Sequence, residues 1–436
     1  MEIYVYDNLQ AEDSAMIQAL YSRSSDSVTK HIEKVKETGS GKFMEKFYVG
    51  YGHKSIGQCG STTIFFENVS LLAAKAIQDS QLYNGQECST RYLDFKNKGC
   101  YDPVNTEQSQ KIINTWMRFY EKCLSVLQEH LKSVYPKPND IKESEYQRAI
   151  NARCFDVARG FLPTGLKTNL SLHTTLAHAS DKLTELSFHP LLEVRQLALR
   201  TLMILESKYP HSFKNTNTNE QNECIKEFVE AFSYIDVNPE DIKGMDVIDY
   251  RMDKEYCNNF CKNVIKTRPK GVMLPDILKI LGDCVFDFTI DFGSFRDFQR
   301  HRSVLMTMPL IKGKRGFNEW YINQFPEHFQ SKVKKFIELQ FFNIKELQKY
   351  NDILKENLQY FYPLGTNVDV VCIANLPSLV YILELRTQKT VHPTLRKEMQ
   401  KIGRSLQKDF PDIPMYIDYD QEDFTLKRAS QTIIEK

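Results

Sequence analysis

Two short stretches of this 436-residue chain gather side chains suited to binding an anion. Residues 296–302 read Arg-Asp-Phe-Gln-Arg-His-Arg and follow an apolar, strand-like stretch. The cationic or titratable side chains of this run cannot all face one way on a helix, so at least one should turn away from solvent and meet a partner. The alternative is a solvated charge cluster, which is what most charge runs are.

The second stretch, residues 84–92, reads Asn-Gly-Gln-Glu-Cys-Ser-Thr-Arg-Tyr. A glycine followed by hydroxyl groups and a guanidinium gives one short loop both backbone N–H donors and forked donors, a combination that suits a phosphate and a sugar. An ordinary polar turn has a similar composition, so the loop by itself leaves both interpretations open.

The composition excludes several classes of protein. With 42% hydrophobic and 26% charged residues the chain is globular, and 57 Lys+Arg against 56 Asp+Glu give a net charge of +1. This balance argues against binding to a nucleic-acid backbone. No apolar run reaches the roughly 18 residues of a membrane span, and the first residues lack a secretory pattern, so we expect a cytoplasmic protein.

The ten cysteines are scattered along the chain. Only Cys257 and Cys261 stand at a short spacing, and no matching pair occurs elsewhere. We therefore expect reduced cysteines and no metal site.

The elements that must position the two stretches occur twice. Each half has a long helical pattern, a second apolar helix, and a third helix that begins at a His-Pro pair. The first turn of a helix tolerates proline, because the N–H that proline lacks has no partner there. The pairs are 107–135 with 330–360, 169–187 with 367–387, and the helices that follow His189 and His392. Matching order and matching prolines predict an internal duplication.

The fold class follows from these patterns. Alternating apolar residues predict strands at 3–6, 61–66 and 286–290. We expect a mixed α+β fold of two repeats, 1–220 and 221–436, each helix-rich with a small, mostly antiparallel sheet. The polar run 215–220 is the best linker, although the second repeat could start anywhere up to about residue 245.

Taken together, the two stretches resemble a motif of the flavin-dependent thymidylate synthases (the ThyX family), Arg-His-Arg-x-x-Ser-x-Asn-Glu-x-Ser-x-Arg-Tyr. Here the motif is divided between the halves. Residues 300–302 supply Arg-His-Arg, and residues 87–92 supply Glu-Cys-Ser-Thr-Arg-Tyr. The first half has Asp-Ser-Gln at 79–81 where Arg-His-Arg belongs, and the second half loses the Glu-x-Ser-x-Arg end over 303–309.

Other family blocks divide in the same way. The Ala-Arg-x-x-Leu-Pro block survives at 158–163 with Arg159, while the second half has Gln359 at that place. The later Asn and Leu-Arg elements survive only as Asn375 and Arg386. Random decay would scatter such losses, whereas losses sorted by half are what selection for one composite site would leave.

The resemblance implies a role for each matching residue. The pyrimidine nucleotide would contact residues of the loop 84–92, of the run 296–302 and of two further arginine positions; these residues are Glu87, Cys88, Ser89, Thr90, Arg91, Arg159, Asp297, Arg300 and Arg386. FAD would contact Ser24, His53, Ser55, Glu87, Arg300, His301, Arg302 and Asn375, where residues 52–55 resemble a Gly-His-x-Thr segment.

Arg386 would be the catalytic residue, because a guanidinium beside a uracil ring favours the N3 anion and so raises the electron density at C5. No enzyme nucleophile is then needed, although Cys88 beside Ser89 leaves a covalent mechanism open. Asp297 stands where the family commonly has glutamine. A carboxylate there would prefer N–H groups and admits cytosine as well as uracil, or it pairs with Arg296 or Arg300.

We therefore expect an enzyme that transfers a one-carbon unit reductively to C5 of a dUMP-like nucleotide, with FAD, NADPH and methylenetetrahydrofolate. One composite site would form per chain, in a homodimer that imitates a four-subunit assembly. The alternative is a catalytically silent flavin- or nucleotide-binding scaffold; base modification of nucleic acid is disfavoured by the charge balance. The sequence leaves open which nucleotide and donor are used, and whether the site forms within or between chains.

Overall fold

The computed structural model describes residues 8–22, 24, 26–214, 217–237, 239–243, 248–264, 267–351 and 353–424. The expected strand at 3–6 and part of the expected linker at 215–220 lie outside these residues. The chain forms two compact units, each assembled from separate segments. The first comprises Met1–Asn68, Leu82–Glu87 and Asn169–Ser233; the second comprises Val69–Gln81, Cys88–Thr168 and Tyr234–Lys436.

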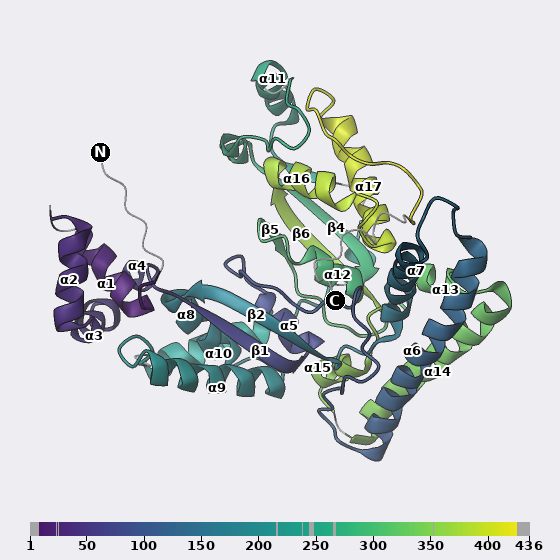
Figure 1. The fold of residues 1–436 in the computed structure, drawn as a ribbon, viewed down its shortest axis with the longest axis horizontal. Coiled ribbons are helices and arrows are strands. Elements are labelled where there is room, and N and C mark those ends of the chain that lie inside the picture. The colour runs from purple at the N-terminus through teal and green to yellow at the C-terminus, as the bar shows by residue number, and fades with distance from the viewer. Residues whose placement is uncertain are drawn as a thin grey trace. The chain divides into compact units, whose positions relative to one another are not determined.

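The first unit is largely helical (Figure 1). Its helices are α1 (Ala11–Tyr21), α2 (Val28–Thr38), α3 (Gly41–Phe43), the π-helical η1 (Met44–Gly50), α4 (Lys54–Gly57), α8 (Leu176–Leu186), α9 (Leu192–Lys208) and α10 (Asn219–Phe232). Ala15, Met44, Tyr48 and Ile56 form one buried cluster of its core. β1 (Ser61–Ser70) pairs with β2 (Lys167–Thr175), and the division between the units falls inside both strands.

The second unit contains a four-stranded sheet in the order β3-β4-β6-β5, in which every neighbouring pair is antiparallel. The strands are β3 (Asp249–Arg251), β4 (Asp283–Asp291), β5 (Val304–Met306) and β6 (Asn367–Asn375). Apolar side chains alternate along the two long strands, and those of Phe286 and Phe288 on β4 and Val370 on β6 are buried. The period of two places these side chains in the core.

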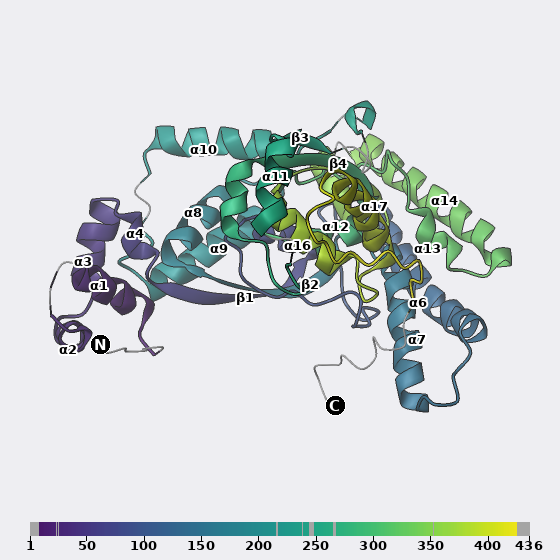
Figure 2. The ribbon, with the colours of Figure 1, turned by 90° about the horizontal axis from the view of Figure 1, so that it is seen from above.

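Helices complete the second unit. They are α5 (Leu71–Gln78), α6 (Glu107–Val134), α7 (Glu143–Ala158), η2 (Arg159–Phe161), η3 (Pro239–Asp241), α11 (Lys254–Val264), η4 (Asp276–Leu281), α12 (Phe292–Phe298), α13 (Glu319–Asn323), α14 (Glu327–Asn351), α15 (Lys355–Leu358), η5 (Gln359–Phe361), α16 (Leu376–Arg386) and α17 (Pro393–Asp409). The long helices α6 and α14 run side by side in both views (Figures 1 and 2), where Phe119 stacks on Phe336 with ring centroids 3.8 Å apart. No helix in the described ranges combines the length and apolar character that a membrane crossing requires.

The mixed α+β fold is confirmed, as are the helix expected at 107–135 and the strands expected at 61–66 and 286–290. Two predictions were wrong in detail. The segments 169–187 and 367–387 each begin with a strand, β2 or β6, before the helix starts, because their first residues alternate buried and partly exposed side chains. The helix expected at 330–360 ends at Asn351, and Leu354, which lies beyond that end, is 63% exposed.

The order of elements repeats between the halves. β2 and β6 both have 9 residues, α8 and α16 both have 11, and α9 and α17 both have 17. Because the compact units take residues from both halves, the repeat boundary near residue 220 stays a prediction.

Equivalent loops of the two halves bind each other reciprocally within the second unit. The N–H of Thr164 donates to the carbonyl of Tyr362 over 2.9 Å, and the N–H of Leu364 donates to the carbonyl of Leu162 over 2.8 Å. Gly165 donates in the same manner to Tyr360, and Gly365 donates to Gly160. Such an exchange is what a local two-fold relation between repeats produces.

Gly165→Ala should destabilise the fold, because an added Cβ would lie 2.7 Å from the carbonyl oxygen of Tyr101 and 3.0 Å from that of Tyr360. Backbone atoms cannot move aside as a flexible side chain can, so we expect the free energy of unfolding to fall by about 1–3 kcal/mol. Gly99→Ala is the matched control, since its nearest neighbour would be 3.9 Å away. Equal urea midpoints for the two variants would contradict the close packing of these loops.

Candidate functional site

The site is organised around α12, the short helix that follows β4. Asp291 caps this helix by accepting the N–H of Ser294 over 2.8 Å, and nearly all of the helix residues are buried. The charge run 296–302 is therefore not simply a solvated face. Arg296 is 6% exposed and His301 is 8% exposed, whereas Arg300 and Arg302 are exposed. This confirms the expectation that at least one side chain of the run turns inward.

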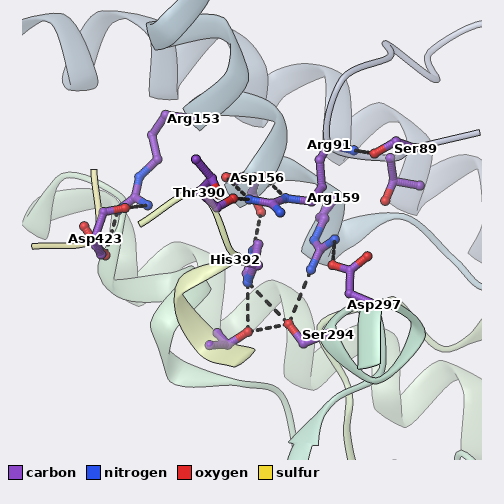
Figure 3. Close-up of polar contacts among 12 residues, drawn as sticks. Ser89, Arg91, Arg153, Asp156, Arg159, Ser294, Asp297, Thr390, His392 and Asp423 are labelled. Carbon is purple, nitrogen blue, oxygen red and sulfur yellow. Dashed lines mark hydrogen bonds and ion pairs between the residues drawn. The ribbon is translucent and has the colours of Figure 1, made fainter. Parts of the chain in front are cut away.

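Asp297 of α12 binds Arg159, which comes from the first half of the sequence. The Nη1 of Arg159 lies 3.1 Å from Oδ2 of Asp297, and its Nη2 donates to Oγ of Ser294 over 3.3 Å (Figure 3). The side chain of Arg159 is 1% exposed and that of Asp297 is 25% exposed. The expectation that Asp297 pairs with Arg296 or Arg300 was wrong, because within the described ranges its ion pair is with Arg159.

The charge of Asp297 is held in place by its neighbours. Burial opposes ionisation of this carboxyl, but the charge of Arg159 and then those of Arg91 and Arg386 hold its pKa well below the usual range. Asp297 therefore remains an anion, and its Oδ1 accepts no hydrogen bond from the described part of the chain.

Arg91, at the end of the loop 84–92, forms a second arginine–carboxylate pair. Its Nε donates to Oδ1 of Asp156 over 2.7 Å and its Nη2 donates to Oδ2 over 3.1 Å. The same Nη2 reaches the carbonyl of Thr390 over 3.1 Å, so a first-half arginine binds the second half of the same chain (Figure 3). A bidentate pair of this kind fixes both position and orientation.

Arg386, the expected catalytic residue, is held at the end of α16 by two acceptors. Its Nε donates to Nε2 of His301 over 2.6 Å, and its Nη2 donates to the carbonyl of Asp297 over 3.0 Å. The first bond requires a neutral imidazole whose Nε2 carries no proton. Burial, and then the charge of Arg386, lower the pKa of His301 to about 3 and so keep it neutral.

Buried polar residues that sequence reasoning missed support these groups. His392 contacts Thr394 through Nδ1 over 2.8 Å and the carbonyl of Asp156 through Nε2 over 3.1 Å. Its ring lies 4.8 Å from that of Trp320, centroid to centroid. The sequence marks His392 only as the residue before a helix that starts with proline, and the one signal for Asp156 is its place one helical turn before Arg159.

The balance of charge around the site is positive. Five arginines act on Asp297 or His301, namely Arg91, Arg159, Arg296, Arg300 and Arg386. They face the carboxyl groups of Asp156, Asp291 and Asp297, of which Asp291 has a pKa raised by burial. An excess of guanidinium groups over carboxylates suits an anionic ligand.

The remaining predicted residues divide between the two units. Thr90 is buried and lies 3.5 Å from Nη1 of Arg296, Cys88 and Ser89 are half-buried, and Asn375 caps α16 by accepting the N–H of Ser378. Ser24, His53, Ser55 and Glu87 belong to the first unit. There Ser24 bonds to Asp26, and His53 stacks on Tyr51 with ring centroids 5.9 Å apart. The roles of all these residues stay predictions.

The opposite pairing of the halves carries different groups. Gln359, at the place of Arg159, is fully buried and accepts the N–H of Ile311 over 3.0 Å. Helix α5 is the first-half equivalent of α12, and the two helices start after Ser70 and Asp291. At the positions of Ser294 and Asp297, α5 has Ala73 and Ala76. The arginine–aspartate site thus forms where Arg159 of the first half meets α12 of the second half, and not where Gln359 stands. Within the part of the chain that the structure describes, no three His, Cys, Asp or Glu side chains are grouped to hold a metal ion.

The two halves of this α+β fold share one arginine–aspartate site, whose charge balance suits an anionic ligand. A family model, described as thymidylate synthase complementing protein, matches residues 5–211 of the chain. This match confirms, for the first half of the chain, the resemblance to the flavin-dependent thymidylate synthases that the split motif indicated.

Relatives extend the similarity through the second half. A UPF0159 protein of Chlamydia pneumoniae is 25% identical over 455 residues, which cover 89% of this chain and 82% of the relative. A UPF0159 protein of Thermoplasma acidophilum is 22% identical over 501 residues, which cover 97% of this chain and 98% of the relative. The similarity to these relatives therefore extends over both halves of the chain.

The free energy of unfolding should fall as the pH is lowered from 6.5 towards 3, and His301→Gln should weaken this dependence. In the unfolded chain His301 is protonated as the pH falls below about 6.5, whereas in the folded protein its pKa is about 3 and it stays neutral down to that pH. This residue's share is about 1.4 kcal/mol per pH unit in that window and is absent above it. Glutamine keeps an acceptor for Arg386. The free energy of unfolding of both proteins is measured by urea denaturation at pH 7, 6 and 5. An equal loss of stability with falling pH in the parent and in His301→Gln would contradict the neutral imidazole.

Proposed function

We propose that the protein is a flavin-dependent enzyme of the thymidylate synthase type, which transfers a one-carbon unit reductively to C5 of a pyrimidine nucleotide at one composite site per chain. The relationship to the thymidylate synthase complementing proteins supports the reaction class. The observation that carries the proposal is the meeting of the two complementary residue sets. Arg91 and Arg159 of the first half contact Thr390 and Asp297 of the second half, in one compact unit of one chain.

The site residues would divide the work as follows. Arg386 is oriented by His301 and by the Asp297 carbonyl. Its remaining N–H groups would donate to the pyrimidine ring and place the guanidinium charge beside it. Stabilising electron density on the ring activates C5 for attack on the methylene group of methylenetetrahydrofolate. FAD, when bound and reduced by NADPH, would supply the hydride that turns the methylene into a methyl group, while C5 loses its proton and tetrahydrofolate is released.

The donor set fits the flavin cofactor. Arg300 and Arg302 are exposed on either side of the buried His301, and two guanidinium groups suit a dinucleotide diphosphate. Asn375 uses its amide oxygen as a helix cap, which leaves the amide nitrogen as a donor. Ser24, His53, Ser55 and Glu87 complete the set by resemblance to the family.

The nucleotide phosphate would lie near Arg91 and the N–H groups of the loop that carries Ser89 and Thr90. Arg91 is 12% exposed despite its pair with Asp156, whereas Arg159 is almost completely buried and occupied by Asp297 and Ser294. We therefore assign Arg159 a positioning role, in which it fixes Asp297 and does not itself bind the phosphate.

The alternative, a scaffold without activity, would bind flavin or nucleotide through the same groups. NADPH-dependent reduction of bound FAD in the presence of a pyrimidine nucleotide separates the two functions. An enzyme of this type must reduce its flavin in each turnover, whereas a scaffold only binds it. We also propose a cytoplasmic homodimer, which analytical ultracentrifugation tests directly.

Titration with FAD should saturate near one flavin per 50.9 kDa chain. Arg300→Ala should weaken FAD binding by about tenfold or more, since one charge-assisted hydrogen bond is worth about 1.5–3 kcal/mol. Arg200→Ala on α9, an exposed arginine outside the proposed set, is the matched control and should bind FAD as the parent does. Two flavins per chain would refute the composite site. An unchanged affinity for FAD in Arg300→Ala would show that Arg300 does not bind the cofactor.

Mixing an Arg91→Ala chain with an Arg386→Ala chain should restore no activity. Arg91 and Arg386 belong to one compact unit of one chain, so each variant chain carries its own lesion and no mixed assembly regains an intact site. Product formation is measured after the two proteins have been unfolded together and refolded, with a mixture of parent and variant chains as the control for subunit exchange. Recovery of activity would mean that the halves of the site meet between chains.

A further inference from the structure

An accessible carboxylate oxygen lies inside the arginine cluster. Asp297 uses Oδ2 to bind Arg159, and one quarter of its side chain remains exposed. Its Oδ1 accepts no hydrogen bond from any residue in the described ranges. A site rich in guanidinium donors thus presents one fixed acceptor with no partner among the described residues, on a side chain that faces Arg159 (Figure 3).

A fixed donor is bonded to the residue that carries this acceptor. Arg386 uses Nε for His301 and Nη2 for the main-chain carbonyl of Asp297 itself, so its guanidinium is tied to the residue that carries the acceptor. Its Nη1 meets no acceptor in the described part of the chain, and Asp297 forms its ion pair with Arg159 instead. Asp297 therefore offers a ligand an acceptor, and Arg386, which is bonded to the main chain of the same residue, offers it a donor.

We infer that Asp297 selects a pyrimidine nucleotide whose ring bears an exocyclic amine, as cytosine does. This inference rests on the proposed function and narrows its substrate class. The exocyclic amine of cytosine would donate to Oδ1 of Asp297, while the unprotonated N3 would accept from Nη1 of Arg386, so the two groups suit the amine and N3 of one edge of the ring.

A uracil ring fits these groups less well. Its C4 carries a carbonyl oxygen, and a carbonyl facing a carboxylate brings two acceptors together with no proton between them. If the ring turned so that N3–H met Asp297, the carboxylate would oppose the loss of that proton, because two like charges would then lie side by side. A carboxylate at this place therefore works against the N3 anion that a uracil substrate would need for activation.

The inference is tested by the binding of dCMP and dUMP to the full-length, FAD-loaded protein, measured by isothermal titration calorimetry. The parent protein should bind dCMP more tightly than dUMP by about tenfold or more, the worth of one hydrogen bond to a charged group. This comparison needs no variant. Equal affinities, or tighter binding of dUMP, overturn the inference.

Asp297→Asn should shift the preference towards dUMP. The N–H of Arg159 requires an acceptor, so the amide oxygen of the new side chain stays turned towards it and the amide NH2 faces the ligand as a donor. That donor suits the C4 carbonyl of uracil and opposes the amine of cytosine. We expect the ratio of the two dissociation constants to move by about tenfold towards dUMP, and an unchanged ratio would overturn the inference.

Asp156→Asn is the matched control. It removes a carboxylate charge from the same arginine cluster, but Asp156 is 1% exposed and cannot offer an acceptor to a ligand. Both nucleotides should respond equally to it, and a shift in preference as large as that of Asp297→Asn would show that charge alone decides. A protein that takes up no FAD contradicts the proposed function, whereas a protein that takes up FAD and prefers dUMP contradicts only this inference.

Discussion

The buried guanidinium of Arg159 is the constraint around which the site is built. A charge that is 1% exposed has lost its hydration and must be compensated by neighbouring groups. Asp297 and Ser294 supply that compensation from a helix that lies more than 130 residues further along the chain. Because removing one partner would leave the other charge buried and unpaired, the two halves are bound to each other at this point.

The same constraint orders the rest of the site. Once Asp297 is fixed, its main-chain carbonyl holds Arg386, and His301 can hold the other side of that guanidinium only as a neutral imidazole. Asp156, one helical turn before Arg159, holds Arg91, while His392 donates from Nε2 to the carbonyl of Asp156 and packs on Trp320. The network is fully polar yet mostly buried, which is the condition under which hydrogen bonds fix side chains in one arrangement.

The two halves contribute unequally although their elements match. Equivalent loops exchange equivalent hydrogen bonds, as between Thr164 and Tyr362 and between Leu364 and Leu162. The side chains placed by this framework differ, since Gln359 and Ala76 occupy the places that Arg159 and Asp297 take on the other side. A symmetric backbone thus carries one charged site, and this asymmetry supports a single composite site per chain.

The sequence by itself determined the periodic elements and the residue types that could do chemistry. Helix α6, the paired third helices and the division of the motif were all readable, because periodicity and spacing are local properties. Tertiary structure alone decided that Asp297 binds Arg159 and not its sequence neighbours Arg296 and Arg300. It also decided that Arg159 is enclosed while Arg300 is exposed, and that β2 and β6 precede their helices. These outcomes depend on which distant surfaces exclude water from each other, and no local pattern records that.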